Sequence, residues 1–535
     1  MALTNSTARS AATRAVVAEA ARRRTFAIIS HPDAGKTTLT EKLLLYGGAI
    51  AEAGAVRARR SGRAAVSDWM EMERERGISI SSTVLRFEVG DTVFNLLDTP
   101  GHRDFSEDTL RVLAAADAAV MLLDAAKGIE EQTLKLFQVA HERRVPLLTF
   151  VNKFDRPALE PLELLDEIER ELGLRAAPVT WPVGMGTDFE GVVDRRHGVF
   201  HRYSRTPGGA SEAPEERIAL EDAAVQGDGS WAACREELAL LDEVDAQLDP
   251  DAFLRGEATP VFFGSALSNF GVRLILDALV ELAPGPSAWR GADGGERPLD
   301  SPFSALVFKL QANVDPRHRD RLSFLRVCSG RFDRGMRVVN ARTGRPLALN
   351  YAHHVFGQER RTLDVAYPGD VVGLTGLGDL RIGDTLYCDS SVRYPPIPVL
   401  APEHFVRARN RGAARYKQFR RGLAQLDEEG VVQVLRDPQL GDQGPILAGA
   451  GPMQFEVAKH RLASEFGAEV SLEEAPYRVA RRIRDTDADA VTRSPHADLL
   501  LRADGTNVAA FSSDFRLRRF SEEQPDVRLD RFLVR

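Results

Sequence analysis

The sequence predicts three consecutive domains: an α/β domain with a mostly parallel sheet, a small β-barrel, and a C-terminal α/β (α+β) domain. Strand-like and helix-like patterns alternate through about the first 290 residues, which is typical of a parallel sheet covered by helices on both faces. Two stretches rich in proline and glycine, 283–302 and 394–403, then divide the chain. Between them lie short β-prone runs separated by Gly-containing turns, as in a small barrel.

Apolar runs of strand length define the first domain. Two of them, TVLRFEV and TVFNLLD, are joined through Gly90 and Asp91, which predicts a hairpin. The other strands are expected at 25–30, 118–125, 145–155 and 260–266, and helices at 37–47, 130–143 and 161–173. A polar, acidic stretch at about 203–258 is expected to form a helical insertion at the edge of the sheet.

The length of 535 residues also indicates several domains, because one hydrophobic core rarely serves so long a chain. The expected boundaries are an N-terminal extension at 1–24, the first domain at 25–290, the barrel at 301–395 and the last domain at 402–535. After residue 402, helix-like and strand-like runs alternate again. We found no internal repeat and no low-complexity tract.

Composition narrows the class of protein. No apolar run approaches the roughly 20 residues of a membrane helix, and the N-terminus lacks a continuous apolar signal core. Three widely spaced cysteines favour neither a zinc site nor a disulfide framework, and fit a reducing cytoplasm. A net charge of −8 argues against general nucleic-acid coating but leaves room for a local basic surface.

The stretch FAIISHPDAGKTTLT at 26–40 predicts a phosphate-binding loop between a strand and a helix. Gly35 would allow close backbone approach, Lys36 would supply charge to the β- and γ-phosphates, and Thr37 would ligate Mg²⁺. Ser30 stands where the consensus has its first glycine. That position starts the turn and does not touch phosphate, so a serine serves there if its φ is negative.

Three further elements follow predicted strands. In LLDTPGH at 96–102, Asp98 is expected to hold Mg²⁺ through water, and the Gly101 N–H to approach a γ-phosphate. In NKFD, the Asp155 carboxylate can accept two hydrogen bonds from guanine, a donor pair that adenine does not offer on that edge. Asn152 is expected to bond the base from another side, the Lys153 stem to cover its face, and Ala266 N–H in GSAL to meet guanine O6.

With these residues in view, the chain resembles the translational GTPases, whose five nucleotide elements match SHPDAGKTT, RGISI, DTPGH, NKFD and SAL. Members of this superfamily often lack the first consensus glycine. Longer stretches resemble the bacterial family of peptide chain release factor three, among them VSDWMEMERERGISISS, DTPGHRDFSEDTLRVL and FKLQANVDPRHRDRLSFLRVCSGRFDRGM. The likeness runs from about residue 22 into the third domain and fades after about 480. It implies an α/β P-loop GTPase domain, followed by a small β-barrel and a C-terminal α/β (α+β) domain.

The resemblance also implies roles for individual residues. His102 matches the histidine that positions the attacking water, and Ser79 stands where many relatives have a Mg²⁺-ligating threonine. Arg103 departs from the acidic residue usual after that histidine, which leaves the packing of switch II open. The expected nucleotide-binding residues are His31, Pro32, Asp33, Ala34, Gly35, Lys36, Thr37, Thr38, Asp98, Thr99, Pro100, Gly101, His102, Asn152, Lys153, Asp155, Ser265, Ala266 and Leu267, and the expected metal ligands are Thr37, Ser79 and Asp98.

The implied activity is hydrolysis of GTP to GDP and phosphate on the ribosome at termination. The GTP form is expected to drive release and recycling of a class I release factor after peptide release, and hydrolysis is then expected to free the protein itself. GTP/GDP and Mg²⁺ are the implied cofactors, and rRNA, ribosomal proteins and the class I factor the implied partners of a cytoplasmic monomer without a membrane contact. Two alternatives are another translational GTPase of elongation-factor type and a metabolic GTPase subunit such as one that assists sulfate activation. A tRNA carrier would need a second β-barrel in place of the last α/β domain.

A basic segment at 407–421 predicts RNA contact, because it clusters positive charge without an acidic residue in a chain of net charge −8. Its basic residues are Arg407, Arg409, Arg411, Arg415, Lys417, Arg420 and Arg421. A second basic run, RARRSGR at 57–63, fits either RNA contact or a solvated switch I loop.

Overall fold

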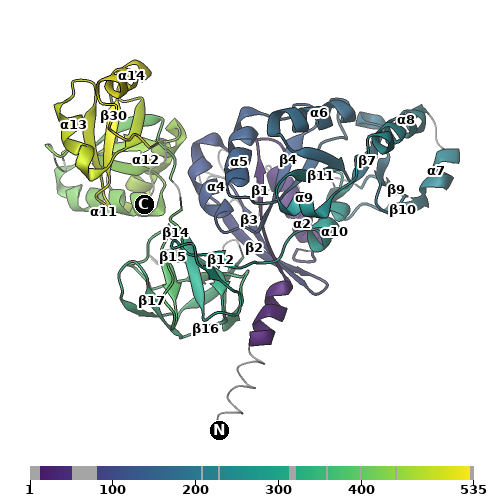
Figure 1. Cartoon of the computed structure of the whole chain (residues 1–535), viewed down its shortest axis with the longest axis horizontal. Helices are drawn as coiled ribbons and strands as arrows, with labels where there is room; N and C mark the ends of the chain where they lie inside the picture. The colour runs from purple at the N-terminus through teal and green to yellow at the C-terminus, as the bar shows by residue number, and fades with distance from the viewer. Residues whose placement is uncertain are drawn as a thin grey trace, which may run out of the picture.

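The structure is a computed structural model that describes residues 13–50, 81–206, 209–226, 229–312, 321–356, 359–397, 399–439, 441 and 443–530. Three sheets, each with its own helices or strands around it, form three domains in chain order (Figure 1). Helical residues 13–21 precede the first strand and project from the first domain (Figure 1). Within the described ranges, no helix has the length and apolar character needed to cross a bilayer.

The first domain is built on a seven-stranded sheet in which β2 alone runs antiparallel to its neighbour. The hairpin expected at Gly90 joins β2 to β3, and Gly90 has a φ of 55° that glycine adopts without strain. In sheet order the strands are β2 (Thr83–Val89), β3 (Thr92–Asp98), β1 (Arg23–Ser30), β4 (Ala118–Asp124), β5 (Leu147–Asn152), β11 (Ala258–Phe263) and β6 (Arg175–Pro178).

Alternate residues of β1 face opposite sides of this sheet. Both faces are therefore apolar, and helices cover each of them. Phe26 and Ile28 belong to a core with α2 (Lys36–Tyr46) and α10 (Val272–Glu281). Ala27 and Ile29 belong to the core on the other face. That face is covered by α4 (Ser106–Leu113), α5 (Glu131–Glu142) and α6 (Pro161–Leu172).

The insertion predicted to be helical at about 203–258 also contains a strand. β10 (Glu215–Ala219) pairs with β9 (Val199–Tyr203) at the edge of a four-stranded antiparallel sheet with β8 (Gly191–Asp194) and β7 (Thr180–Val183). The sequence EERIA is polar and largely exposed, so it carries no apolar alternation that would predict a strand. Helices α7 (Leu220–Gln226), α8 (Gly229–Glu243) and α9 (Pro250–Leu254) complete the region.

The second domain is a sheet of eight strands whose neighbours are all antiparallel. The order is β18 (Pro346–Ala348), β17 (Arg337–Asn340), β23 (Thr385–Tyr387), β14 (Ser304–Ala312), β15 (Arg321–Ser329), β22 (Val371–Leu374), β19 (Ala352–Phe356) and β20 (Glu359–Thr362). Two short pairs flank it, β12 (Trp289–Arg290) with β13 (Glu296–Arg297) and β16 (Phe332–Asp333) with β21 (Val365–Ala366).

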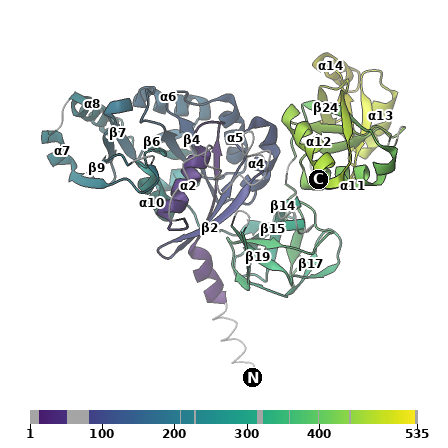
Figure 2. The ribbon, with the colours of Figure 1, turned by 180° about the vertical axis from the view of Figure 1, so that it is seen from behind.

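The third domain has a seven-stranded antiparallel sheet with helices on it (Figure 2). The strand order is β27 (Val470–Glu474), β24 (His404–Asn410), β26 (Ile446–Gly449), β25 (Gln433–Arg436), β29 (Asp498–Arg502), β30 (Asn507–Phe511) and β28 (Val479–Arg482). The helices are α11 (Tyr416–Glu429), α12 (Pro452–Phe466), α13 (Ala488–Arg493) and α14 (Asp514–Glu523). The α11 face with Phe419, Leu423 and Leu426 packs in one core with α12.

Candidate nucleotide-binding site

Four loops meet at one edge of the first sheet. They follow the carboxyl ends of β1, β3, β5 and β11, which run parallel in the centre of the sheet. Ligands of open α/β sheets bind at this edge. The fold therefore brings together the elements around Gly35, Asp98, Asp155 and Ala266 that the sequence separates by up to about 230 residues.

The phosphate loop has the backbone conformation that its glycine predicts. Gly35 is the N-cap of α2 with a φ of 101°, and a Cβ added there would lie 2.4 Å from Asn152 Nδ2. Ser30 ends β1, is buried, and is not among the described non-glycine residues with positive φ. The serine therefore meets the one condition set by replacing the consensus glycine. The N–H groups at the start of α2 are available for an anion.

Lys36 and Asp98 form the phosphate and metal end of the site. Lys36 Nζ lies 2.6 Å from Asp98 Oδ1, and both side chains are almost fully buried. Thr37 is half-buried at the start of α2, while Gly101 follows β3 close to Pro32 and the Lys36 side chain. A buried lysine paired with one carboxylate can turn to an incoming phosphate, because the phosphate oxygens offer it stronger acceptors.

At the end of the site where the guanine base is expected, the described residues leave one hydrogen-bond acceptor without a partner. Asp155 Oδ1 is buried and, in the described part of the chain, has no hydrogen-bond partner. An unpaired buried carboxylate oxygen costs free energy unless a ligand supplies a donor, and guanine N1–H and its amino group are such donors. The orphaned oxygen is therefore the feature of the structure that fits guanine.

Asn152 and Ala266 are arranged differently from the sequence-based expectation. Asn152 Nδ2 donates to Ala34 O at 2.8 Å, and its Oδ1 accepts from Ala266 N at 2.8 Å. In this structure Asn152 Oδ1 takes the Ala266 N–H that was expected to meet guanine O6, so the contact of that N–H with the base stays a prediction. The amide instead ties the phosphate loop to the loop of Ser265, Ala266 and Leu267, where Ser265 Oγ accepts from Ser268 N at 3.2 Å.

Lys153 bridges the base end and the phosphate loop. Its Nζ donates to Asp33 O at 2.5 Å and contacts Asp124 Oδ2 at 2.6 Å. Asp33 and Lys153 both have positive φ, 68° and 76°, a conformation that costs free energy in residues with a side chain and concentrates at functional sites. Asp124 was not among the predicted site residues. The same signal, a carboxylate ending an apolar strand, would have found it.

His102 lies where the loop after β3 turns into the short helix η2 (Arg103–Phe105). It caps this helix, since its Nδ1 accepts from Asp104 N at 3.3 Å. Arg103 is 74% exposed, so replacing an acidic residue there disturbs no buried packing. Asp104 Oδ2 accepts from Met453 N at 2.7 Å, which joins this turn to α12 of the third domain.

The remaining predicted residues complete the loops or lie outside the described chain. His31, Pro32 and Thr38 are half-buried in and after the phosphate loop, and burial is the main cause that lowers the pKa of His31. Thr99 donates from Oγ1 to Ile28 O at 2.5 Å, and Pro100 O lies 3.5 Å from Thr109 Oγ1. Ser79 and the basic run 57–63 lie outside the described residues.

Curated relatives match nearly the whole chain. A "Peptide chain release factor 3" from Acaryochloris marina is 49% identical over 512 residues, which are 95% of this chain and 95% of the relative. One from Gloeobacter violaceus is 50% identical over 518 residues, 96% of this chain and 98% of the relative. The chain belongs to the peptide chain release factor 3 family. It is therefore a translational GTPase of the termination class, as the sequence predicted.

Three family models match this release factor 3 family member, and each match covers one of the three domains described above. The elongation factor Tu GTP binding domain matches 21–285, elongation factor G domain 2 matches 302–389, and the class II release factor RF3 C-terminal domain matches 394–521. A crystal structure of a protein from Thermus thermophilus shares the fold, with a TM-score of 0.69 and 24% identity over 90% of this chain and 73% of that one. The predicted fold class is confirmed.

Gly35→Ala should lower the affinity of this family member for GDP by about tenfold or more. The new methyl group would collide with Asn152 Nδ2, which holds Ala34 O, and alanine is strained at a φ of 101°. Titration with a fluorescent guanine nucleotide measures the loss. Gly48→Ala is the matched control, because Gly48 has a φ of 67° but open space around it. Equal affinities of the two variants would contradict the role of Gly35.

Proposed function

We propose that the chain is a ribosome-stimulated GTPase that promotes dissociation and recycling of class I release factors after peptide release. The observation that carries the proposal is the match to release factor 3 relatives over the GTPase domain, the barrel and the last domain together. The similarity to peptide chain release factor 3 proteins supports the ribosome and a class I factor as partners, and the cytoplasm as the place of action. The chain is proposed to act as a monomer.

The loops at the edge of the first sheet support GTP as the substrate. We assign the base to Asp155, Asn152 and the loop 265–267, and the phosphates to residues 31–38, with Lys36 exchanging Asp98 for phosphate oxygens. Mg²⁺ would be held by Thr37, Ser79 and Asp98, and would supply charge stabilisation between the phosphates when bound. Asp98 would act on the ion through a water molecule.

The chemistry asks the protein mainly for positioning, since phosphoryl transfer needs little covalent help. With Nδ1 accepting the Asp104 N–H, the neutral His102 ring carries its proton on Nε2. That nitrogen can orient an attacking water next to Gly101. The hydrolysis rate then depends on whether the 102–105 turn points His102 at the γ-phosphate, which a ribosome contact can control.

Ribosome co-sedimentation tests this function against both alternatives. The chain should pellet with ribosomes in a non-hydrolysable GTP analogue and remain in the supernatant with GDP. It should then displace a class I factor from ribosomes that carry deacylated tRNA. A metabolic GTPase subunit would stay in the supernatant with either nucleotide. An elongation-type factor would pellet but would leave the class I factor in place.

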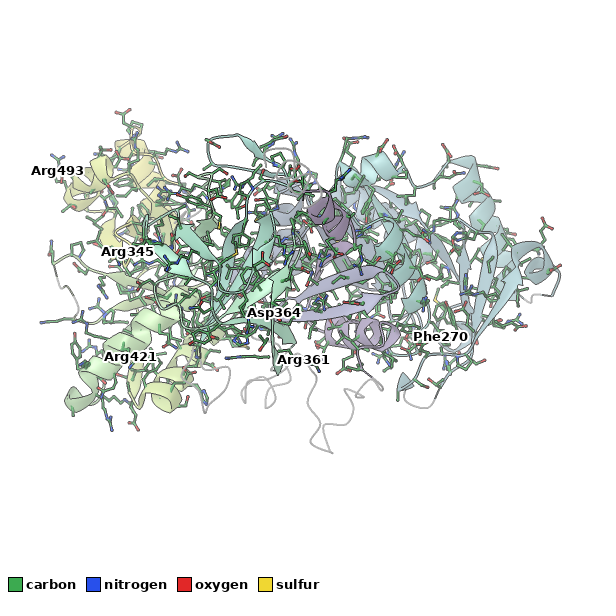
Figure 3. All side chains as sticks on the ribbon, turned by 90° about the horizontal axis from the view of Figure 1, so that it is seen from below. Phe270, Arg345, Arg361, Asp364, Arg421 and Arg493 are labelled. Carbon is green, nitrogen blue, oxygen red and sulfur yellow. The ribbon has the colours of Figure 1, made fainter. Side chains whose placement is uncertain are left out.

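The basic segment 407–421 supports an RNA contact in the third domain. Arg407 and Arg409 lie on β24, a short 3₁₀ turn at 413–415 follows, and α11 begins at Tyr416. Arg411, Arg415 and Lys417 are exposed, whereas Arg409 pairs with Glu473 at 3.0 Å. Figure 3 shows Arg421 well separated from Phe270, which pairs with Ser265 of the nucleotide site.

Replacing Arg411, Arg415 and Lys417 with alanine should flatten the salt dependence of ribosome binding. Each phosphate contact releases counterions and adds roughly 0.7–0.9 to the slope of log affinity against log salt. The triple variant should therefore lose about two to three units of slope, with guanine nucleotide affinity off the ribosome unchanged. Ribosome binding measured across a salt series provides both slopes.

The matched control replaces Arg493, Arg516 and Arg518, three exposed basic residues of α13 and α14 in the same domain. Both triple variants remove the same net charge. If their salt slopes agree, the segment 407–421 is an ordinary solvated surface. A loss of slope confined to the first variant supports direct phosphate contact.

A further inference from the structure

A lysine of the barrel is buried against the GTPase domain. Lys309 lies within β14 and is only 3% exposed, although the strand belongs to the second domain. Charged side chains are almost never so buried without a specific partner set. The other side chains of β14 are mostly apolar, as expected for the core of the barrel. The burial of the Lys309 charge therefore needs an explanation other than the stability of the barrel.

In the described part of the chain, Lys309 forms hydrogen bonds and an ion pair with residues of the GTPase domain. Its Nζ donates to Ser82 O, to Ser82 Oγ at 2.7 Å and to Ser81 Oγ at 2.9 Å, and lies 3.5 Å from Asp108 Oδ2. Ser82 N in turn donates to Asp108 Oδ2 at 2.7 Å. One ammonium group thus holds the chain that enters β2 and the first turn of α4 together.

Both of these segments lead directly to the nucleotide site. Ser82 precedes Thr83, whose register partner across β2 and β3 is Asp98, the residue that contacts Lys36. Asp108 lies in α4, which follows the turn that carries His102. In sequence, Ser82 is also three residues after Ser79, the predicted metal ligand. The ammonium group therefore contacts the residue that precedes β2, and β2 pairs with the strand that ends at Asp98.

The positive charge of Lys309 lies close to the negative charge of Asp108 at the contact between the barrel and the GTPase domain. Burial alone would raise the pKa of the Asp108 carboxyl, but Lys309 and Arg111 hold that pKa below its ordinary value. Asp108 is thus a carboxylate that faces two cations, and the Lys309 ammonium also lies 5.9 Å from the Phe324 ring centre. Removing the lysine would leave the partly buried Asp108 carboxylate beside the start of β2 with Arg111 as its remaining cation.

We propose that Lys309 is a positioning residue through which the barrel domain holds β2 and α4 in the arrangement that binds the γ-phosphate and metal end of GTP. The proposal rests on the assignment of the nucleotide site made above. It names a specific contact by which the second domain favours GTP over GDP. The γ-phosphate end is the part of the site next to Asp98 and Gly101. The contacts of Lys309 with Ser82 and Asp108 lie on the segments that lead to that end.

The test is nucleotide discrimination by the full chain carrying Lys309→Met. A lost charge-assisted hydrogen bond at the γ-phosphate end should raise the Kd for a non-hydrolysable GTP analogue by about tenfold. The Kd for GDP should change by less than about twofold, since GDP lacks the phosphate at that end. Equilibrium titration with both nucleotides, in the presence of Mg²⁺, gives the ratio.

Arg326→Met is the matched control, because it also removes a buried cation from the barrel side of the same domain interface. Arg326 lies on the neighbouring strand β15 and pairs with Asp117 at 2.5 Å and with Thr25, neither of which belongs to β2, α4 or the turn of His102. This control should lower the thermal midpoint without changing the ratio of the two Kd values. An equal change of ratio in both variants, or an equal loss of both nucleotides in Lys309→Met, would overturn the proposal.

Ser82→Ala provides a milder variant if Lys309→Met does not fold. It removes the Ser82 hydroxyl acceptor and leaves the lysine in place, so a selective loss of GTP analogue of about threefold is expected. An unchanged ratio in a folded Ser82→Ala, with Lys309→Met unfolded, would also overturn the proposal. The parent chain separates this outcome from a failure of the proposed function, because a parent that binds no guanine nucleotide would refute the site itself.

Discussion

Asp155→Asn should change the base preference of the site from guanine to xanthine. The buried Oδ1 of Asp155 has no protein partner among the described residues, so in the complex it is free to accept from guanine. An asparagine amide in this place donates, which mismatches the guanine amino group and suits the O2 acceptor of xanthine. A mismatched buried hydrogen bond costs about 1–3 kcal/mol, so GDP affinity should fall by about 10- to 100-fold.

Titration of parent and variant with GDP and xanthosine diphosphate measures this exchange. Asp166→Asn is the control, because Asp166 is an exposed carboxylate on α6 of the same domain and its replacement removes the same charge. A variant with the parent affinity for GDP would remove Asp155 from the base-binding residues. A variant that loses GDP without gaining the xanthine nucleotide would place Asp155 in the packing of the loop alone.

The parts of the fold that could be predicted from sequence are those with strong local patterns. The β1–loop–α2 unit follows from an apolar strand, Gly35 and a helix that ends at Gly47. The hairpin at Gly90 follows from a turn signal between two alternating runs. β10 could not be predicted, because its stabilisation comes from backbone pairing with β9 and from cross-strand pairs such as His201 with Glu215, not from its own sequence.

The candidate site also has parts that could be predicted from the sequence and parts that could not. Residues at strand ends, such as Asp98 and Asp155, are predictable because parallel strands present their carboxyl ends at one edge. The use of Ala266 N–H by Asn152 was not predictable, since it depends on how two loops 114 residues apart approach each other. Lys309 was not predictable for the same reason, because it interrupts an apolar strand and the partners described above lie 201 to 228 residues away in another domain.

His102→Ala should abolish most ribosome-stimulated GTP hydrolysis and leave nucleotide binding nearly intact. In the described structure His102 contacts its own turn through Asp104, and no hydrogen bond joins it to the phosphate loop or to the base end. Its removal therefore spares ground-state binding and acts on the transition state, where the water must be in line with the γ-phosphate. Loss of such a group is expected to lower turnover by about 100-fold or more.

Single-turnover hydrolysis on ribosomes, with the Kd for GTP measured separately, distinguishes these two effects. His141→Ala is the control, because His141 is an exposed histidine at the end of α5 in the same domain. The control should keep the parent rate and the parent Kd. If His102→Ala hydrolyses GTP at the parent rate, another group positions the water. If it instead weakens GTP binding as much as it slows hydrolysis, the 102–105 turn contributes to substrate binding, because an interaction made only in the transition state leaves the Kd unchanged.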